Sequence, residues 1–405
     1  MTSTLIPPDL YYPEFDPGWL RHSLYDLATW INGMAFKDIN FANLGTPVIK
    51  IAEIRNGVSG QTRFTQEKYD PKYFLQDGDM LFCWSGQPET SIDTYWWRGG
   101  EGWLNQHIFK VLPNQGLVDR SFFYQLLRYL RPTFVQIARN KQTTGLGHVT
   151  KTDLQRLVVA IPPLQVQRGI AATLGALDDK IESNRRSQAT GEKLIRSLVT
   201  AALERSTGEV GVLSDYCNLI KEPARIGALT ADLRYIAFEH MPRGSIFLDD
   251  WGNAEGLGSD KSYFQVGDIL FGKLRPYFKK VGIAPVDGVC STDILVLRPI
   301  RKADTALVAV VASSDPLIDS LSAAATGTRM PRASWKDLAS WPVPEMTTLE
   351  RGELADQVAP LVERLTAMTH ETKRLQLLRD TLLPELLSGR IRVPEAREAV
   401  QEVVT

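Results

Sequence analysis

Two stretches of the chain place apolar residues in alternating steps of four and three, the spacing of a coiled-coil seam on one face of a helix. The first stretch runs from Leu164 to Leu203, and the second covers Leu354 to Leu386. The first seam consists of Ile170, Leu174, Leu177, Ile181, Asn184, Gln188, Gly191, Ile195, Leu198 and Ala202. The second seam consists of Leu354, Val358, Leu361, Leu365, Met368, Thr372, Leu375, Arg379, Leu382 and Leu386. We therefore predict two long helices, with seven and eight of their ten seam positions apolar.

Neither seam is stable when exposed to water, so we predict that the two helices bury them against each other as an antiparallel coiled coil. Because the helices lie about 180 residues apart in sequence, the segment between them must form a domain of its own. The alternative is that each helix packs only on its neighbouring domain. Asn184, Gln188 and Gly191 interrupt the first seam, and Pro360 removes a helix hydrogen bond, so the second helix is expected to bend or restart there.

The segment before the first helix has a different pattern, with short β-rich runs bounded by glycine, proline or asparagine. These runs are TPVIKIAEI, YFLQDGDMLFCW and HIFKVLPN. A helix is predicted from Arg120 to Arg139, where phenylalanine and leucine recur on one side. A polar loop with two glycines, a short helical turn and a strand ending in two prolines follow. The pattern predicts an α+β domain.

The segment after the first helix repeats this plan at an offset of about 180 to 190 residues. The repeated features are a Tyr-Phe and Gly-Asp motif, from Tyr73 to Asp79 and from Tyr263 to Asp268, and a Thr-Gly loop at Thr144 and Thr326. We therefore predict an α+β fold with two tandem globular domains, separated and joined by two long helices. The predicted parts are an N-terminal extension (1–18), a first domain (19–163), a central helix (164–205), a second domain (206–345), a C-terminal helix (346–393) and a tail (394–405).

Composition adds few constraints to this picture. The chain has 405 residues, 43% of them hydrophobic, which is enough for ordinary cores, and its formal net charge is −1. No apolar run approaches the roughly 20 residues that span a bilayer, and the N-terminus has no signal-peptide pattern. Three widely spaced cysteines suit a reducing compartment, so we expect a cytoplasmic protein that does not associate with membranes. Binding of nucleic acid would require local basic patches or partner subunits.

Signals for catalysis are missing from the sequence. It contains no phosphate-binding G-x-x-x-x-G-K-[ST] loop and no Asn-Pro-Pro-aromatic tetrapeptide of amino-methyltransferases. The five histidines and three cysteines show no metal-ligand spacing. We therefore expect a non-catalytic chain that binds no cofactor or metal itself.

Two loops are candidates for contacts with DNA. In the second domain, a strand end is followed by Lys273, Arg275, Tyr277, Lys279 and Lys280. The cations there would neutralise phosphates, and Arg275 would alternatively reach a guanine edge with two hydrogen bonds. A solvated surface of strand and loop explains the same residues. The corresponding stretch of the first domain, WSGQPE, is not basic.

The second candidate is the Thr-Gly loop of each domain, where amide, hydroxyl, imidazole and guanidinium groups accompany glycine. In the first domain these residues are Lys141, Gln142, Thr143, Thr144 and His148. In the second domain they are Thr328, Arg329 and Arg332, next to Thr326. The alternative is a plain turn that links a helix to a strand. For His148, a DNA contact and an ordinary surface histidine remain equally open.

The residues also resemble a known family. LGALDDKIESNRR and LLPELLSGRIRV look like the helical repeat regions of the specificity subunits of type I restriction-modification systems. KLRPYFKKVGIA and the Tyr-Phe and Gly-Asp motifs look like the target-recognition domains of that family. The order and duplication of these motifs from Trp19 to Val393 carry the resemblance.

The resemblance implies a non-catalytic subunit that binds double-stranded DNA. Each globular domain would read one half of a split site, the helices would set the spacer, and two methyltransferase subunits would dock on them. Restriction subunits with motor and nuclease activity would join for cleavage, and S-adenosylmethionine and ATP would bind to the partner subunits. A helix of about 38 residues is about 57 Å long, which limits the spacing of the two half-sites to roughly 15 base pairs. The alternatives are a coiled-coil scaffold without DNA sequence specificity and a stand-alone enzyme.

Overall fold

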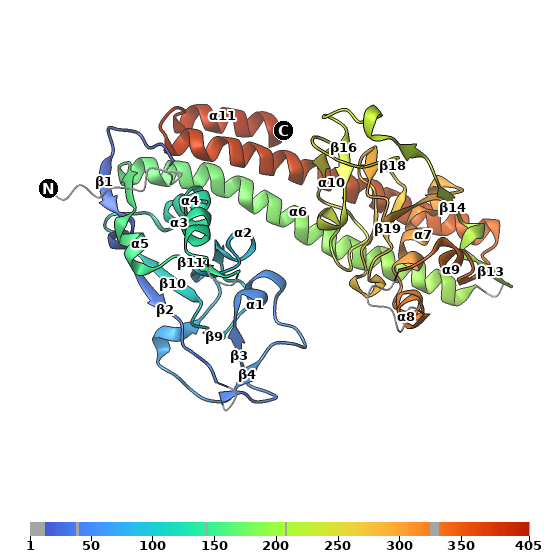
Figure 1. Cartoon of the computed structure of the whole chain (residues 1–405), viewed down its shortest axis with the longest axis horizontal. Coiled ribbons are helices and arrows are strands. Elements are labelled where there is room, and N and C mark those ends of the chain that lie inside the picture. The colour runs from blue at the N-terminus through green and yellow to red at the C-terminus, as the bar shows by residue number, and fades with distance from the viewer. Residues whose placement is uncertain (1–12, 38–39, 143–144, 207–208, 325–331, 405) are drawn as a thin grey trace. The chain divides into compact units, whose positions relative to one another are not determined.

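The computed structural model describes residues 13–37, 40–142, 145–206, 209–324 and 332–404. The chain divides into two compact units, one made of Met1–Asp178 with Leu377–Thr405 and the other of Asp179–Gln376. We call these unit 1 and unit 2. Each unit contains one globular domain and a part of each long helix (Figure 1).

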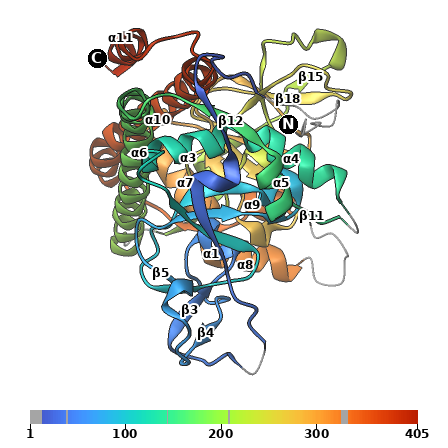
Figure 2. The ribbon, with the colours of Figure 1, turned by 90° about the vertical axis from the view of Figure 1, so that its left-hand side faces the viewer.

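The globular domain of unit 1 is built from short strands and helices. The strands are β1 (Leu20–Ser23), β2 (Ala28–Asn32), β3 (Thr46–Ile49), β4 (Phe64–Thr65), β5 (Phe74–Leu75), β6 (Met80–Cys83), β7 (Ser85–Gly86), β8 (Asp93–Trp96), β9 (Gly102–Leu104), β10 (Ile108–Pro113), β11 (Gly147–His148) and β12 (Val158–Ile161). The helices are α1 (Ile51–Asn56), α2 (Pro88–Ser91), α3 (Arg120–Tyr129), α4 (Arg131–Asn140) and α5 (Lys151–Arg156) (Figure 2). One sheet has the antiparallel order β2-β10-β6-β8, and the other has the order β4-β3-β9-β5 with β3 parallel to β9. Strand β1 pairs with β12, and β7 pairs with β11.

The continuous helix predicted from Arg120 to Arg139 is wrong, because the structure has two helices there. Asp119 caps α3 by accepting hydrogen bonds from the backbone N–H groups of Ser121 and Phe122, both at 3.0 Å. Pro132 is the second residue of α4. A backbone N–H in the first turn of a helix has no helical acceptor, so proline, which lacks this N–H, costs no hydrogen bond there. In the middle of a continuous helix the same residue would remove a hydrogen bond, so the chain turns before it.

The globular domain of unit 2 contains a second set of elements. The strands are β13 (Val210–Val212), β14 (Cys217–Ile220), β15 (Pro223–Ala224), β16 (Arg234–Ile236), β17 (Gly252–Asn253), β18 (Lys261–Phe264), β19 (Ile269–Gly272), β20 (Val281–Ile283), β21 (Gly288–Cys290), β22 (Ile294–Pro299) and β23 (Pro342–Pro344). The helices are α7 (Thr305–Ala312), α8 (Asp315–Ala324) and α9 (Trp335–Ala339). The sheet orders are β14-β22-β19-β20 and β15-β18-β21-β16-β17, and β13 pairs with β23.

The two domains share one topology, so the predicted tandem duplication is confirmed. The order β14-β22-β19-β20 repeats β2-β10-β6-β8 strand for strand. The order β18-β21-β16-β17 repeats β5-β9-β3-β4, and in both sheets the third strand is parallel to the second. Helices α7, α8 and α9 follow the sheets of unit 2 as α3, α4 and α5 follow those of unit 1.

The repeated Gly-Asp motif has the same structural role in both domains. Its glycine has φ of +90° in unit 1 and +88° in unit 2, values that suit glycine. The carboxylate of Asp79 accepts a hydrogen bond from the backbone N–H three residues earlier and pairs with Lys110 at 2.8 Å. The carboxylate of Asp268 accepts the same backbone bond and pairs with Arg298, also at 2.8 Å. The motif therefore fixes the turn into β6 and into β19.

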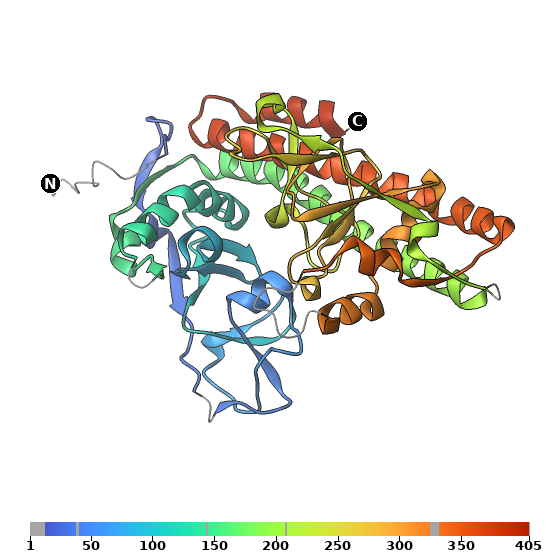
Figure 3. The same ribbon diagram turned by 45° about the vertical axis from the view of Figure 1, so that its right-hand side comes forward.

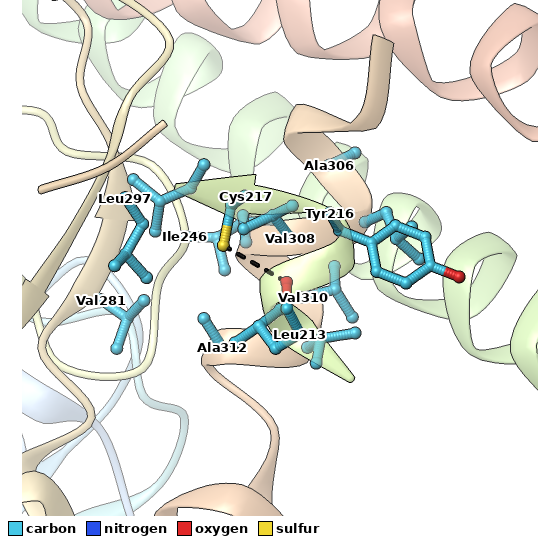
Figure 4. Close-up of a cluster of buried hydrophobic side chains, with 14 of the residues drawn as sticks. Leu213, Tyr216, Cys217, Ile246, Val281, Leu297, Ala306, Val308, Val310 and Ala312 are labelled. Carbon is cyan, nitrogen blue, oxygen red and sulfur yellow. Dashed lines mark hydrogen bonds between the residues drawn. The ribbon is translucent and has the colours of Figure 1, made fainter. Parts of the chain in front are cut away.

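The core of unit 2 lies between the sheet that contains β19 and the fully buried helix α7. Figure 4 shows Cys217 in this core among Val281, Leu297 and Val308. The thiol of Cys217 is completely buried and donates to the carbonyl oxygen of Leu213 at 3.6 Å. Residues of both long helices extend the same cluster, so the helices are part of the domain core.

The two long helices, α6 (Leu164–Arg205) and α10 (Thr348–Leu387), pair in an antiparallel direction. In unit 2, the side-chain amide of Asn184 donates to the carboxylate of Glu371 at 2.8 Å. One turn further along α6, the side-chain amide of Gln188 donates to the hydroxyl of Thr369 at 2.8 Å. Residue numbers therefore increase along α6 while those of its partners on α10 decrease, which is the antiparallel arrangement (Figure 3). In unit 1, Arg379 contacts Asp178 at 3.0 Å. The pairing excludes the alternative in which each helix packs only on its neighbouring domain.

The C-terminal helices differ from the prediction in two respects. Helix α10 continues through Pro360 without ending or restarting, and the proline is exposed. After α10 the chain forms a further helix, α11 (Val393–Val404), where the sequence analysis predicted only a tail. A Cβ atom at Gly169 of α6 would lie 3.1 Å from the side chain of Val393, so a larger residue there would require the valine to shift by a few tenths of an ångström.

The described part of the N-terminal extension belongs to unit 1 and contacts helix α3. The ring of Phe15 meets Tyr129 edge-on at 5.6 Å, and the hydroxyl of Tyr129 donates to the carbonyl of Glu14 at 2.8 Å. In the described residues, no single helix is long and apolar enough to cross a membrane. The pair α7 and α8 reaches that length and composition only across a bend of 54°.

Candidate functional site

In unit 2, the described end of the second candidate loop, at Arg332, lies beside the loop after β19. The loop after β19 begins at Lys273, and the second loop ends at Arg332, just before α9. Leu274 and Arg332 form an antiparallel β-bridge, and the backbone N–H of Ala333 donates to the carbonyl of Lys273 at 2.9 Å. The backbone therefore brings the two candidate stretches to one surface of the unit.

Unit 1 has the same arrangement. Strand β7 pairs with β11, which places Ser85 opposite His148. The backbone N–H of Val149 donates to the carbonyl of Trp84 at 2.8 Å, as Ala333 does to Lys273 in unit 2. The loop after β6 and the loop before α5 thus correspond to the pair of loops in unit 2.

In the loop after β19, three of the four predicted cations are bound to acceptors of the protein. The ammonium of Lys273 donates to the carbonyl of Thr292 at 2.5 Å, and Lys279 pairs with Asp315 at 2.6 Å. The ammonium of Lys280 donates to the carbonyl of Phe238. Burial, together with a nearby arginine, lowers the pKa of Lys280. These three lysines therefore hold the loop in place.

Arg275 and Tyr277 remain on the surface of this loop. Arg275 is exposed, and its guanidinium carbon lies 6.0 Å from the centre of the Phe278 ring. Arg243 covers the same ring at 4.0 Å, a contact the sequence analysis missed because it comes from a segment about 30 residues earlier. Arg332 is also exposed and lies 3.4 Å from Asp293. The surface thus presents arginine and aromatic groups.

In unit 1, the predicted residues of the Thr-Gly loop are partly bound within the protein. Lys141 pairs with Asp153 at 2.6 Å. Burial acts to raise the pKa of Asp153, but hydrogen bonds from Lys141 and Thr150 outweigh it and lower that pKa. Gln142 donates to the carbonyl of Gly145 at 2.7 Å. His148 is half-buried in β11.

Four further predicted residues, Thr143, Thr144, Thr328 and Arg329, lie outside the described residues.

The loop after β6 is attached to α4 by ion pairs. Arg139 pairs with the carboxylate of Glu89, and this hydrogen bond lowers the pKa of Glu89. Arg131 pairs with Asp93 at 3.0 Å and donates to the carbonyl of Glu89 at 2.6 Å. In unit 1, arginines of α4 hold the loop after β6 in place. In unit 2, lysines of the loop after β19 have this role.

The described residues of these two surfaces offer hydrogen-bonding and cationic groups. Among the described residues, no three His, Cys, Asp or Glu side chains gather as a metal site would require. Donor groups on paired, fixed loops suit recognition of an extended polyanion with acceptor-rich edges.

Comparisons with known proteins agree with this type of surface. Residues 18–190 match the family described as type I restriction modification DNA specificity domain. The chain is 25% identical over 287 residues to the type I restriction enzyme EcoDI specificity subunit of Escherichia coli, covering 60% of this chain and 63% of that subunit. It is 20% identical over 380 residues to the MjaVIII specificity subunit of Methanocaldococcus jannaschii, covering 86% of each chain. This chain is similar to type I restriction-modification specificity subunits.

A solved structure extends the comparison of this chain to the fold. The S subunit of a type I restriction-modification system from M. genitalium superposes with a TM-score of 0.57 at 14% identity, covering 96% of this chain and 99% of that one. The likeness confirms the predicted fold of tandem domains and long helices. The chain spans 63% of the EcoDI subunit and 34% of a second Escherichia coli specificity subunit, EcoBI, so it matches less than two thirds of these relatives.

Proposed function

We propose that this chain is the DNA-recognition subunit of a type I restriction-modification complex and has no catalytic activity of its own. Unit 1 reads one half of a bipartite site in double-stranded DNA, and unit 2 reads the other half. The observation that carries the proposal is a duplicated contact, between the loop after β6 and β11 in unit 1 and between the loop after β19 and Arg332 in unit 2. The two domains that present it share the same strand order, apart from the additional strand β15 in unit 2. Two equivalent binding surfaces with different side chains suit two different half-sites.

Partner subunits supply the chemistry in this proposal. Two methyltransferase subunits, which bind S-adenosylmethionine, dock on the helices α6 and α10, and restriction subunits that use ATP join the complex. Each unit includes part of both helices, and in unit 2 residues of both helices join the domain core, so in this proposal the helices hold the domains and set the spacer between the half-sites. A scaffold without DNA specificity is the less favoured reading, because it has no use for two exposed pairs of loops that differ in sequence.

Single-molecule sequencing of methylated bases tests the proposal. DNA is taken from cells that express the chain with its cognate methyltransferase subunit, and from matched cells that express the methyltransferase subunit alone. We expect a two-part methylated motif that disappears when the chain is absent. A motif that persists without the chain would show that the sequence is read elsewhere.

The scaffold reading is tested separately with the purified complex. Binding is measured to two duplexes that differ only in one half of the motif, at a fixed salt concentration, because salt governs the non-specific part of the affinity. A specificity subunit makes the complex prefer the matched duplex by a factor of ten or more. Equal affinity for both duplexes would favour the scaffold.

A further inference from the structure

The loop after β19 has an unusual backbone. Among the described residues, Arg275 and Lys279 are the non-glycine residues with positive φ, at +51° and +49°. Side chains of L-amino acids disfavour this left-handed region, and glycine adopts it without strain. Both residues lie in the loop that the sequence analysis selected for its charge.

Unit 1 shows what the same backbone position requires. Because β7 and β11 correspond to the bridge between Leu274 and Arg332, Gly86 is the counterpart of Arg275. Gly86 also has positive φ, at +144°. The position thus has a positive φ in both units, although the two conformations differ, and unit 1 has glycine there while unit 2 has arginine in the left-handed region. An arginine kept where glycine fits without strain indicates a role for its side chain.

The surroundings of Arg275 leave its guanidinium available. No hydrogen bond or ion pair of that group is found in the part of the chain that the structure describes, and the side chain is exposed. Its backbone carbonyl accepts the N–H of Phe278 at 2.9 Å, which fixes the turn. The neighbouring Lys279 has the same backbone conformation, but its ammonium is occupied by Asp315.

We propose that Arg275 reads a guanine in the half-site of unit 2, by donating two hydrogen bonds to N7 and O6 in the major groove. The inference rests on the proposed function. A phosphate contact needs only a positive charge, and a lysine or arginine in an ordinary backbone conformation supplies that charge. A planar guanidinium on a fixed turn, in contrast, has the geometry for a pair of parallel hydrogen bonds to one base.

The test compares methylated motifs of complexes that contain the wild-type chain or the variants Arg275→Gly and Arg275→Lys. For the wild type we expect a guanine at one position of the half-site read by unit 2, the position that Arg275 contacts. Both variants lower the preference for guanine at that position about 10- to 100-fold and leave the half-site of unit 1 unchanged. Arg275→Gly also leaves the thermal midpoint of unfolding unchanged or raises it, because glycine relieves the left-handed backbone.

Lys279→Gly is the matched control. It removes one positive charge from the same loop and relieves the same backbone conformation, but its side chain is bound to Asp315, so we expect the wild-type motif. A motif unchanged in Arg275→Gly would overturn the inference and leave the proposed function intact. Methylation that falls equally for all sequences in Arg275→Gly, with guanine still preferred, would also overturn it, in favour of a phosphate contact. Absence of any motif with the wild-type chain would refute the proposed function and this inference with it.

Discussion

The Asp268–Arg298 ion pair gives a quantitative test of how burial determines the free energy of unfolding. The side chain of Asp268 is 3% exposed, and its carboxylate accepts two hydrogen bonds from the Arg298 guanidinium, both at 2.8 Å. Substitution of Arg298→Met leaves this carboxylate buried with one hydrogen bond, from the backbone N–H of Gln265. Loss of one partner of a fully buried pair costs about 3–5 kcal/mol. Because the Arg298 side chain is itself 31% exposed, we expect a cost of about 2–4 kcal/mol, set by the burial of the carboxylate that remains.

The equivalent pair in unit 1 is the control. The side chains of Asp79 and Lys110 are 17% and 15% exposed, so water reaches the carboxylate when the lysine is lost. We expect Lys110→Met to cost about 1–2 kcal/mol, between the values for surface and buried pairs. The double variant Asp268→Asn with Arg298→Met removes the buried charge and is expected to recover part of the loss.

Urea denaturation of the full chain measures these free energies, and hydrogen exchange of the amides in β19 and β6 assigns each loss to a unit. A fall of less than about 1 kcal/mol in the free energy of unfolding of Arg298→Met would contradict this expectation. The expectation would equally fail if Lys110→Met cost as much as Arg298→Met, because burial would then not determine the difference. An effect on β6 exchange in the Arg298→Met variant would show that the pair does not act within its own unit.

Three further predictions concern other parts of the chain. Pro360→Ala restores a hydrogen bond inside α10 at an exposed position, so the free energy of unfolding in urea should rise, by up to about 3 kcal/mol; a fall would show that the proline is needed. Asn184→Ala removes the buried amide that donates to Glu371 and should cost about 1–3 kcal/mol in thermal unfolding, whereas the exposed Arg186→Ala should cost almost nothing. Burial raises the pKa of Cys217 to about 12, so this thiol should react with a disulfide reagent at pH 8 only as fast as the protein unfolds; immediate labelling would contradict the buried position.

The sequence predicts the large features of the fold because they depend on periodic patterns. The seam positions of α6 and α10 are mostly buried, and the Gly-Asp motif correctly indicates a duplicated turn. The break between α3 and α4 was missed because the apolar pattern continues across it, although Pro132 was a visible signal. Helix α11 was missed because a short amphipathic segment at a chain end resembles a tail.

The candidate site was predicted less completely, for a different physical reason. Charge along the chain identifies Lys273, Lys279 and Lys280 as cations, but it does not show which acceptors face them. Those acceptors come from distant segments, such as the carbonyl of Phe238 and the carboxylate of Asp315. Only the folded chain therefore separates the lysines that fix the loop from the arginine that remains available.

The duplication also helps to distinguish residues that maintain the fold from residues that would determine specificity, because corresponding positions of the two units can be compared within one chain. Asp79 and Asp268 are alike and hold the same turn, whereas Gly86 and Arg275 differ on corresponding loops. Arginine cannot simply be moved into unit 1, since a side chain at position 86 would meet the Cβ atom of Ser91 at 2.5 Å. The loop after β6 packs against α2, so it has no room for an arginine at position 86 and must present other groups on its surface. Specificity in the two units therefore diverges through loop conformation as well as through residue type.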